Sequence, residues 1–195
     1  MSLINKIKWI AGILLIFIII LTTNLIDKDN FNRLRYSVTT IYEDRIVASD
    51  LIFEITILIQ EKEMALATED SLFFTTRNDK INQDIQRFIA RYEETKLTSI
   101  EEEIFNNLKG EIQNLTGLER KYIGASLQNN TDLFESIDDI IHHLYDLSKV
   151  QLKEGRREML MSNKTMETID LFTQVEIIFL IFMAVLVQII ILYKL

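Results

Sequence analysis

Residues 34–66 have the sequence LRYSVTTIYEDRIVASDLIFEITILIQEKEMAL, in which apolar side chains recur at alternating steps of three and four residues. Such spacing gathers them on one face of a helix and is typical of helices that pack in bundles and coiled coils. The resulting seam consists of Leu34, Val38, Ile41, Arg45, Ala48, Ile52, Ile55, Ile59, Lys62 and Leu66, and Arg45 interrupts its apolar character. The pattern predicts one long helix over 28–75.

Helical periodicity returns three more times along the chain, and we predict helices at 78–96, 99–127 and 131–171. Ser99 and Glu102 form a predicted capping box for the third helix. The sequence has no Pro and only five Gly, which favours long uninterrupted helices. It therefore predicts an all-α protein with an antiparallel four-helix bundle in 27–171. Because the first helix would outreach the others, we expect its end to fray or its turn to come earlier.

An uncharged apolar segment precedes the predicted bundle. Residues 9–21 are WIAGILLIFIIIL, and TTNLI extends the uncharged run to residue 26. As a helix this run would be about 27 Å long, close to the ~30 Å of a bilayer core. Trp9 lies at the expected interface, with Lys6 and Lys8 just outside. We predict a transmembrane helix at 9–26. A cleaved signal peptide is the alternative, although no small-residue cleavage site follows the run.

A second apolar segment follows the bundle, and we predict a second transmembrane helix at 172–193. Its apolar run, residues 177–193, is interrupted only by Gln188, for which we expect a helix–helix hydrogen bond worth about 0.6–2 kcal/mol. The first and last bundle helices are predicted to continue into the two spans. Since long domains translocate largely regardless of charge, we expect 27–171 in the periplasm. The ends, 1–8 and 194–195, would then lie in the cytoplasm, on either side of an inner-membrane anchor.

Composition argues against several classes of function. The net charge is −8, which suits nucleic-acid phosphates poorly. The absence of Cys excludes disulfides, thiolate metal sites and a Cys nucleophile. The sequence has no Ser/His/Asp set, no phosphate-binding Gly-rich loop and no paired carboxylates with a plausible pocket. We therefore predict a protein that is not an enzyme, needs no cofactor and does not bind nucleic acid.

One helix face carries a weak candidate for a metal site. Asp138, His142 and Asp146 follow one another at four-residue steps, so they share a face of the predicted last helix. Zinc sites usually draw three or four ligands from more than one element. We therefore prefer an ordinary solvated face with helix ion pairs over a shallow divalent site.

The motif Tyr42, Glu43, Asp44 and Arg45 offers a second candidate site. Successive residues of a helix point in different directions, which argues against a shared ligand anchor. Arg45 lies on the apolar seam, and an unpaired buried charge is costly. We interpret Arg45 as a packing residue in an interhelical ion pair, with a ligand anchor as the alternative.

The stretch IYEDRIV at 41–47, followed by Leu51, resembles the first helix of the four-helix-bundle ligand-binding domain of methyl-accepting chemotaxis proteins. In layout, the resemblance covers 1–195: a span, a long helix, two middle helices, a long helix and a span. It implies a periplasmic sensory bundle that dimerises side by side through its first helix. Family members normally continue into a HAMP domain and a cytoplasmic signalling rod, and neither follows here before Leu195. We therefore expect the output to come from another chain.

These observations lead to one principal hypothesis and two alternatives. The principal one is a non-enzymatic sensory-type protein of the inner membrane that detects a ligand or protein and acts through a separate membrane partner. The first alternative is a constitutive structural subunit of an envelope complex. The second is an antagonist that forms heterodimers with full-length receptors. The expected partners are the lipid bilayer and either a second copy or another membrane protein, while a small-molecule ligand is left open.

Overall fold

The computed structural model of the chain is helical along almost all of its described length and contains no strand there. It describes the backbone of residues 3–124 and 130–192. Within these ranges it describes all side chains except those of 3–11, 13, 15, 184 and 187–192. The predicted all-α fold is confirmed. The finer prediction of an antiparallel four-helix bundle is taken up as a proposal below.

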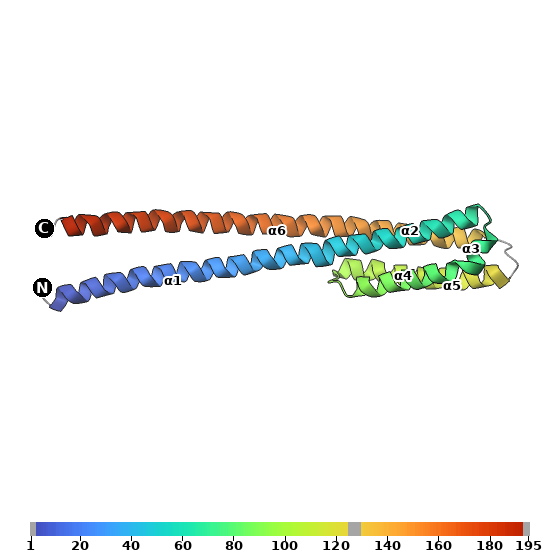
Figure 1. Ribbon diagram of the computed structural model, residues 1–195, viewed down its shortest axis with the longest axis horizontal. Helices are drawn as coiled ribbons and strands as arrows, with labels where there is room; N and C mark the ends of the chain where they lie inside the picture. Colours follow the sequence, from blue (N-terminus) through green and yellow to red (C-terminus); the bar gives the residue numbers. More distant parts are fainter. Residues whose placement is uncertain (1–2, 125–129, 193–195) are drawn as a thin grey trace. The chain divides into compact units, whose positions relative to one another are not determined.

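The helices divide between two compact units, one formed by 1–38 with 158–195 and the other by 39–157. Figure 1 labels the α-helices along the chain. The elements are α1 (Leu3–Thr40), the π-helix η1 (Ile41–Ile46), α2 (Val47–Ala67), α3 (Ser71–Thr76), α4 (Asn78–Glu93), α5 (Ser99–Gly124) and α6 (Thr131–Leu192).

In the unit 39–157, α2, α4, α5 and the first part of α6 share one hydrophobic core. Each helix contributes apolar residues at three- and four-residue steps, because that spacing keeps them on one face. Figure 1 shows α4 and α5 side by side, with α3 at the end where α2 turns back. The most deeply buried core residues include Ala48, Leu51, Ile55, Ile59, Leu66, Ile85, Tyr92, Leu108, Leu133, Ile137, Ile140 and Leu147.

The turn after α2 comes earlier than the predicted helix end at residue 75. α2 ends at Ala67, and Glu69 adopts a left-handed backbone with φ 54°. Asp70 then caps α3 by accepting the backbone N–H of Phe73 at 3.1 Å. Phe73 and Phe74 are buried, so this short helix covers the end of the core. The prediction that the first helix ends at residue 75 was therefore wrong. The turn comes earlier, as expected for a helix that would otherwise outreach the other three.

The capping box of α5 lies one residue before the predicted one. The Thr98 N–H donates to Glu101 Oε2 at 2.6 Å, and the Glu101 N–H donates to Thr98 Oγ1 at 3.3 Å. This is the reciprocal arrangement of a capping box, so the predicted pair Ser99 and Glu102 was wrong. Ser99 and Glu102 are both exposed, whereas Glu101 is fully buried and is also bound by Arg45.

The helix between α1 and α2 changes its hydrogen bonding at η1. The Val47 N–H donates to the Tyr42 carbonyl five residues back, as in a π-helix. From Arg45 onward, the residues of the predicted seam are buried. Before Arg45 the predicted seam is met only in part, since Leu34 and Ile41 are half-buried while Val38 is 56% exposed. The predicted seam was therefore wrong at Val38.

The unit formed by 1–38 and 158–195 contains the predicted membrane segments. None of the helices, as far as the described residues extend, has a stretch long and apolar enough to cross a membrane. Both predicted spans, 9–26 and 172–193, include side chains outside the described residues, among them those of Trp9 and Gln188. The side chains of Lys6 and Lys8 also lie outside them.

Candidate functional site

A buried polar cluster surrounds Arg45. Its Nη1 donates to Glu101 Oε1 at 2.6 Å and to Gln151 Oε1 at 3.1 Å, and its Nη2 donates to the Lys96 carbonyl at 3.4 Å. Gln151 Nε2 in turn donates to the Tyr92 hydroxyl at 2.9 Å. We call Arg45, Tyr92, Glu101 and Gln151 the arginine layer. It joins η1, α4, α5 and α6 in a single network.

The arginine layer is almost completely shielded from water. Relative exposure is 7% for Arg45 and 0% for Glu101. Charges can be buried when they are paired and their remaining polar atoms are hydrogen-bonded. Glu101 meets this condition, because one carboxylate oxygen accepts from Arg45 and the other from the Thr98 N–H. The layer therefore holds its four helical segments in specific relative positions.

Tyr92 links the polar layer to the apolar core. Its hydroxyl accepts the hydrogen bond from Gln151, while its ring packs on Phe105 with a centroid distance of 4.7 Å. Burial raises the pKa of Tyr92 to about 12, since the phenolate would lose its hydration. The hydrogen bond from Gln151 acts in the opposite direction. Tyr92 is therefore a neutral acceptor at physiological pH.

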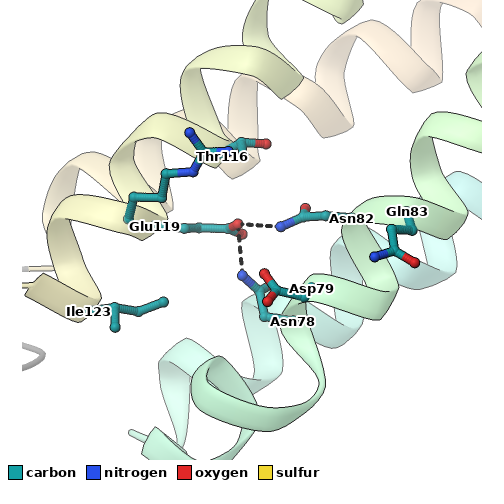
Figure 2. A pocket seen from close by; sticks show the side chains of 8 residues that line it. Asn78, Asp79, Asn82, Gln83, Thr116, Glu119 and Ile123 are labelled. Carbon is teal, nitrogen blue, oxygen red and sulfur yellow. Dashed lines mark hydrogen bonds between the residues drawn. The ribbon is translucent and has the colours of Figure 1, made fainter.

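A second buried cluster surrounds Lys62. Its Nζ donates to a carboxylate oxygen of Glu119, to Asn78 Oδ1 at 2.7 Å and to Asn82 Oδ1 at 2.8 Å. Asn78 Nδ2 and Asn82 Nδ2 donate to Glu119 Oε2 at 2.9 and 3.0 Å. Figure 2 shows the two Asn side chains directed from one helix toward Glu119 on the facing helix. We call these four residues the lysine layer.

The lysine layer satisfies its own polar groups. An ammonium has three N–H donors, and all three donors of Lys62 are used inside the layer. Burial lowers the pKa of Lys62, and the carboxylates of Glu119 and Asp79 oppose this effect. A pocket of about 210 Å³ adjoins the layer and is also lined by the exposed side chains of Asp79, Gln83 and Arg120. The hydrogen bonding indicates that the layer primarily aligns α2, α4 and α5.

The four residues of the Tyr42–Arg45 motif lie in different surroundings. Tyr42 and Glu43 are exposed. Asp44 is half-buried, and its Oδ1 accepts the Lys96 N–H at 2.9 Å. Arg45 alone belongs to the buried network. Asp44 and Arg45 both bind the backbone of Lys96, whereas Tyr42 and Glu43 face away from it into exposed positions.

The weak metal candidates lie on the part of α6 that belongs to the unit 39–157. Asp138 and His142 are exposed and Asp146 is half-buried. Among the residues that the structure describes, no group of three or more His, Cys, Asp or Glu side chains is placed to hold a metal ion. The remaining predicted site residue, Gln188, has its side chain outside the described set.

Sequence reasoning did not single out Glu101, Glu119 or Gln151, although a signal for each was present. Glu101 and Glu119 are separated by apolar residues at alternating four- and three-residue steps, namely Phe105, Leu108, Ile112 and Leu115. Gln151 follows Leu144 and Leu147 in the same manner. A polar residue at a seam position predicts a buried polar contact.

Comparison of the chain with protein-family models, curated proteins and solved structures finds no match.

The arginine layer predicts a large effect of Arg45→Ala on stability. The substitution leaves Glu101 buried without its partner, so the free energy of unfolding should fall by about 3–5 kcal/mol. Arg77→Ala is the control, because the Arg77 side chain is 64% exposed and its Nη2 lies 2.8 Å from Glu61 Oε1. Such surface pairs contribute about 0–1 kcal/mol. Chemical denaturation of the full chain, followed by circular dichroism, measures both losses, and equally small losses would contradict a buried layer.

The raised pKa of Tyr92 predicts a specific loss of stability at alkaline pH. Between pH 10 and about 12 an unfolded tyrosine releases its proton while the buried one keeps it, so the native state binds more protons and stability falls as pH rises. The contribution of Tyr92 amounts to at most about 3 kcal/mol. The free energy of unfolding of the wild type should therefore exceed that of Tyr92→Phe by less and less above pH 10. Lys62 is present in both proteins, so its own titration contributes equally to both and drops out of the difference. If the difference in unfolding free energy stayed constant across this range, Tyr92 would ionise normally.

Proposed function

We propose that this chain is a non-enzymatic, membrane-anchored protein of the sensory type. In this proposal 39–157 forms an antiparallel four-helix bundle in the periplasm, and α1 and α6 continue from it into two inner-membrane spans. The observation that carries the proposal is the continuity of α6, which stays helical from Thr131 to Leu192. It includes both core residues such as Leu133 and apolar exposed residues such as Phe182. A continuous helix can transmit small shifts along its length.

Exposed apolar side chains on both terminal helices support a lipid environment. In α1 they include Leu14, Phe17, Ile18, Leu21 and Leu25. In α6 they include Ile177, Ile178, Ile181 and Phe182. Protein surfaces in contact with water rarely expose large apolar patches, so we expect another apolar surface to cover these faces. The acyl chains of a bilayer would cover them in each predicted span.

The polar side chains of the first predicted span are compatible with that environment. Thr22 Oγ1 donates to the Ile18 carbonyl at 2.8 Å, and Asn24 Nδ2 donates to the Ile20 carbonyl at 2.8 Å. Thr23 Oγ1 donates to Glu176 Oε1 at 3.3 Å. Since lipid offers no hydrogen bonds, internal bonding of this kind is what a membrane helix requires.

The arginine layer suggests how a signal would leave the bundle. Arg45 and Gln151 each lie within about two helical turns of the ends of the unit 39–157. A ligand or protein that displaced α4 or α5 would therefore act on both outer helices through Glu101 and Tyr92. The output would be received by a separate membrane partner.

A constitutive structural subunit of an envelope complex is the second candidate. It is favoured by the hydrogen bonding of the lysine layer, whose donors and acceptors are engaged with one another. Such saturated layers suit a fixed scaffold as well as a sensor.

Cysteine labelling of intact cells tests the proposed topology. The chain has no Cys, so single substitutions give unambiguous signals. A membrane-impermeant maleimide should label Gln113→Cys in the bundle without lysis. It should label Asn5→Cys and Leu195→Cys, at the two ends, only after lysis. Labelling of one end but not the other in intact cells would contradict two spans. Labelling of both ends in intact cells would contradict cytoplasmic ends, and no labelling of Gln113→Cys before lysis would exclude a translocated bundle.

We propose a second copy of the chain as the direct partner. Large apolar residues of η1 and α2 are exposed at steps of four and seven residues: Tyr42, Ile46, Phe53, Ile57 and Met64. This spacing forms a second seam, of the kind that pairs helices side by side. Phe53 borders a groove of about 260 Å³ between α2 and α6, which Ser49, Thr56 and Tyr145 also line. In a two-fold dimer, Phe53 of each copy could enter the groove of the other.

Cross-linking at Phe53 tests this partner. Mild oxidation of membranes that contain Phe53→Cys should give a product of twice the chain mass. Gln113→Cys, on the exposed face of α5, is the matched control and should stay monomeric. A product of any other mass would identify a different partner for this surface, and equal cross-linking at both positions would indicate random collision.

A further inference from the structure

The pocket beside the lysine layer lies between α4 and α5 and has a volume of about 210 Å³. Each of the two helices contributes four lining residues, which are Asn78, Asp79, Asn82, Gln83, Thr116, Glu119, Arg120 and Ile123. Among these eight residues, Ile123 alone has a purely hydrocarbon side chain. Figure 2 shows Asn78 and Asn82 on one wall, directed toward Glu119 on the other. Such a lining suits a ligand that forms hydrogen bonds.

The lysine layer leaves part of the hydrogen-bonding capacity of the pocket unused. A primary amide has two N–H donors, and Asn78 and Asn82 each use one of them on Glu119 Oε2. The Thr116 hydroxyl donates to the Ile112 carbonyl at 2.9 Å, so its oxygen is left as an acceptor. The pocket therefore presents both donors and acceptors.

Two further lining residues extend this mixture. Gln83 and Arg120 are exposed, and no hydrogen bond or ion pair joins either side chain to another residue that the structure describes. Gln83 adds an amide with both donors and an acceptor, while Arg120 adds donors only. They stand on opposite walls of the pocket, one on α4 and the other on α5.

The charges around the pocket balance one another. Lys62 and Glu119 form a buried ion pair with no net charge. Asp79 and Arg120 have opposite charges, and both are exposed, so water screens them. An ion would lose hydration on entering and find no net opposite charge to replace it. The pocket therefore favours a neutral ligand.

We propose that this pocket binds a small neutral polyhydroxy compound, a short polyol or a monosaccharide. A hydroxyl group both donates and accepts hydrogen bonds, so adjacent hydroxyls can pair with neighbouring donors and acceptors of the pocket. The volume lies below the roughly 300–1,000 Å³ of pockets for drug-sized ligands, which limits the ligand to a small molecule.

A ligand in this position would contact α4 and α5 next to the lysine layer. Asn78 and Asn82 would bind it with their second N–H groups while they still bind Lys62 and Glu119. Ligand binding would then stabilise one relative position of α4 and α5. The inference names a ligand class for the proposed sensory function and rests on that function for its biological purpose.

Saturation-transfer NMR on the full chain tests the site, in a detergent without a sugar headgroup. Glycerol, D-ribose and D-glucose are the neutral probes, while glycine and acetate are the charged ones. At least one neutral probe should bind more tightly than both charged probes. Gln83→Trp should fill the pocket and weaken that binding by on the order of tenfold. Gln86→Trp, at an exposed position of α4 outside the pocket, should leave the affinity unchanged.

A second pair of variants avoids the bulk of tryptophan. Thr116→Val removes the hydroxyl acceptor at nearly constant shape, so it should weaken binding by about two- to tenfold. Thr56→Val is the matched control, because Thr56 is also half-buried, donates to a carbonyl of its own helix and lies outside the pocket. It should leave the affinity unchanged.

Three results would overturn the inference. They are no binding of any neutral probe, equal affinities of both pocket variants and their controls, and tighter binding of glycine or acetate than of every neutral probe. The purified chain is used, so the result does not depend on topology. A negative result here, together with the labelling pattern expected for two spans, would reject this ligand site and leave the membrane-anchored bundle in place.

Discussion

The burial of charge is the constraint on which the rest of this structure depends. Arg45 and Lys62 occupy seam positions of η1 and α2, and each requires a carboxylate in the interior. Glu101 and Glu119 of α5 supply these carboxylates. The two basic residues are separated along the chain by nearly the same distance as the two acidic ones. Both pairs therefore form together only when α2 and α5 run in the same direction in one register.

Amide and phenol groups complete the two layers and extend the constraint to the other helices. Asn78 and Asn82 bring in α4 at the lysine layer, while Tyr92 and Gln151 bring in α4 and α6 at the arginine layer. The apolar core supplies most of the burial but tolerates sliding, because apolar contacts are not directional. The polar layers remove that freedom. The same directional bonds offer a route by which a disturbance of α4 or α5 reaches the outer helices.

Helical periodicity was sufficient to predict the fold class and most of the buried residues of α2. Arg45 stood out as a charge on an apolar seam, but Glu101 was not recognised as its partner because the ion pair joins distant parts of the chain. The same buried carboxylate also displaced the capping box to Thr98. Val38 was misassigned because periodicity assumes a regular α-helix, whereas the chain forms the π-helix η1 three residues later.

A double-mutant cycle between Arg45 and Glu101 measures the central interaction most directly. Arg45→Met removes the charge, and Glu101→Gln removes the opposing charge while keeping an oxygen for the Thr98 N–H. Unfolding free energies of the wild type, both single variants and the double variant give the coupling energy. A coupling of about 2 kcal/mol or more is expected for a buried pair that sets the helix register. Additivity within about 0.5 kcal/mol would contradict this account.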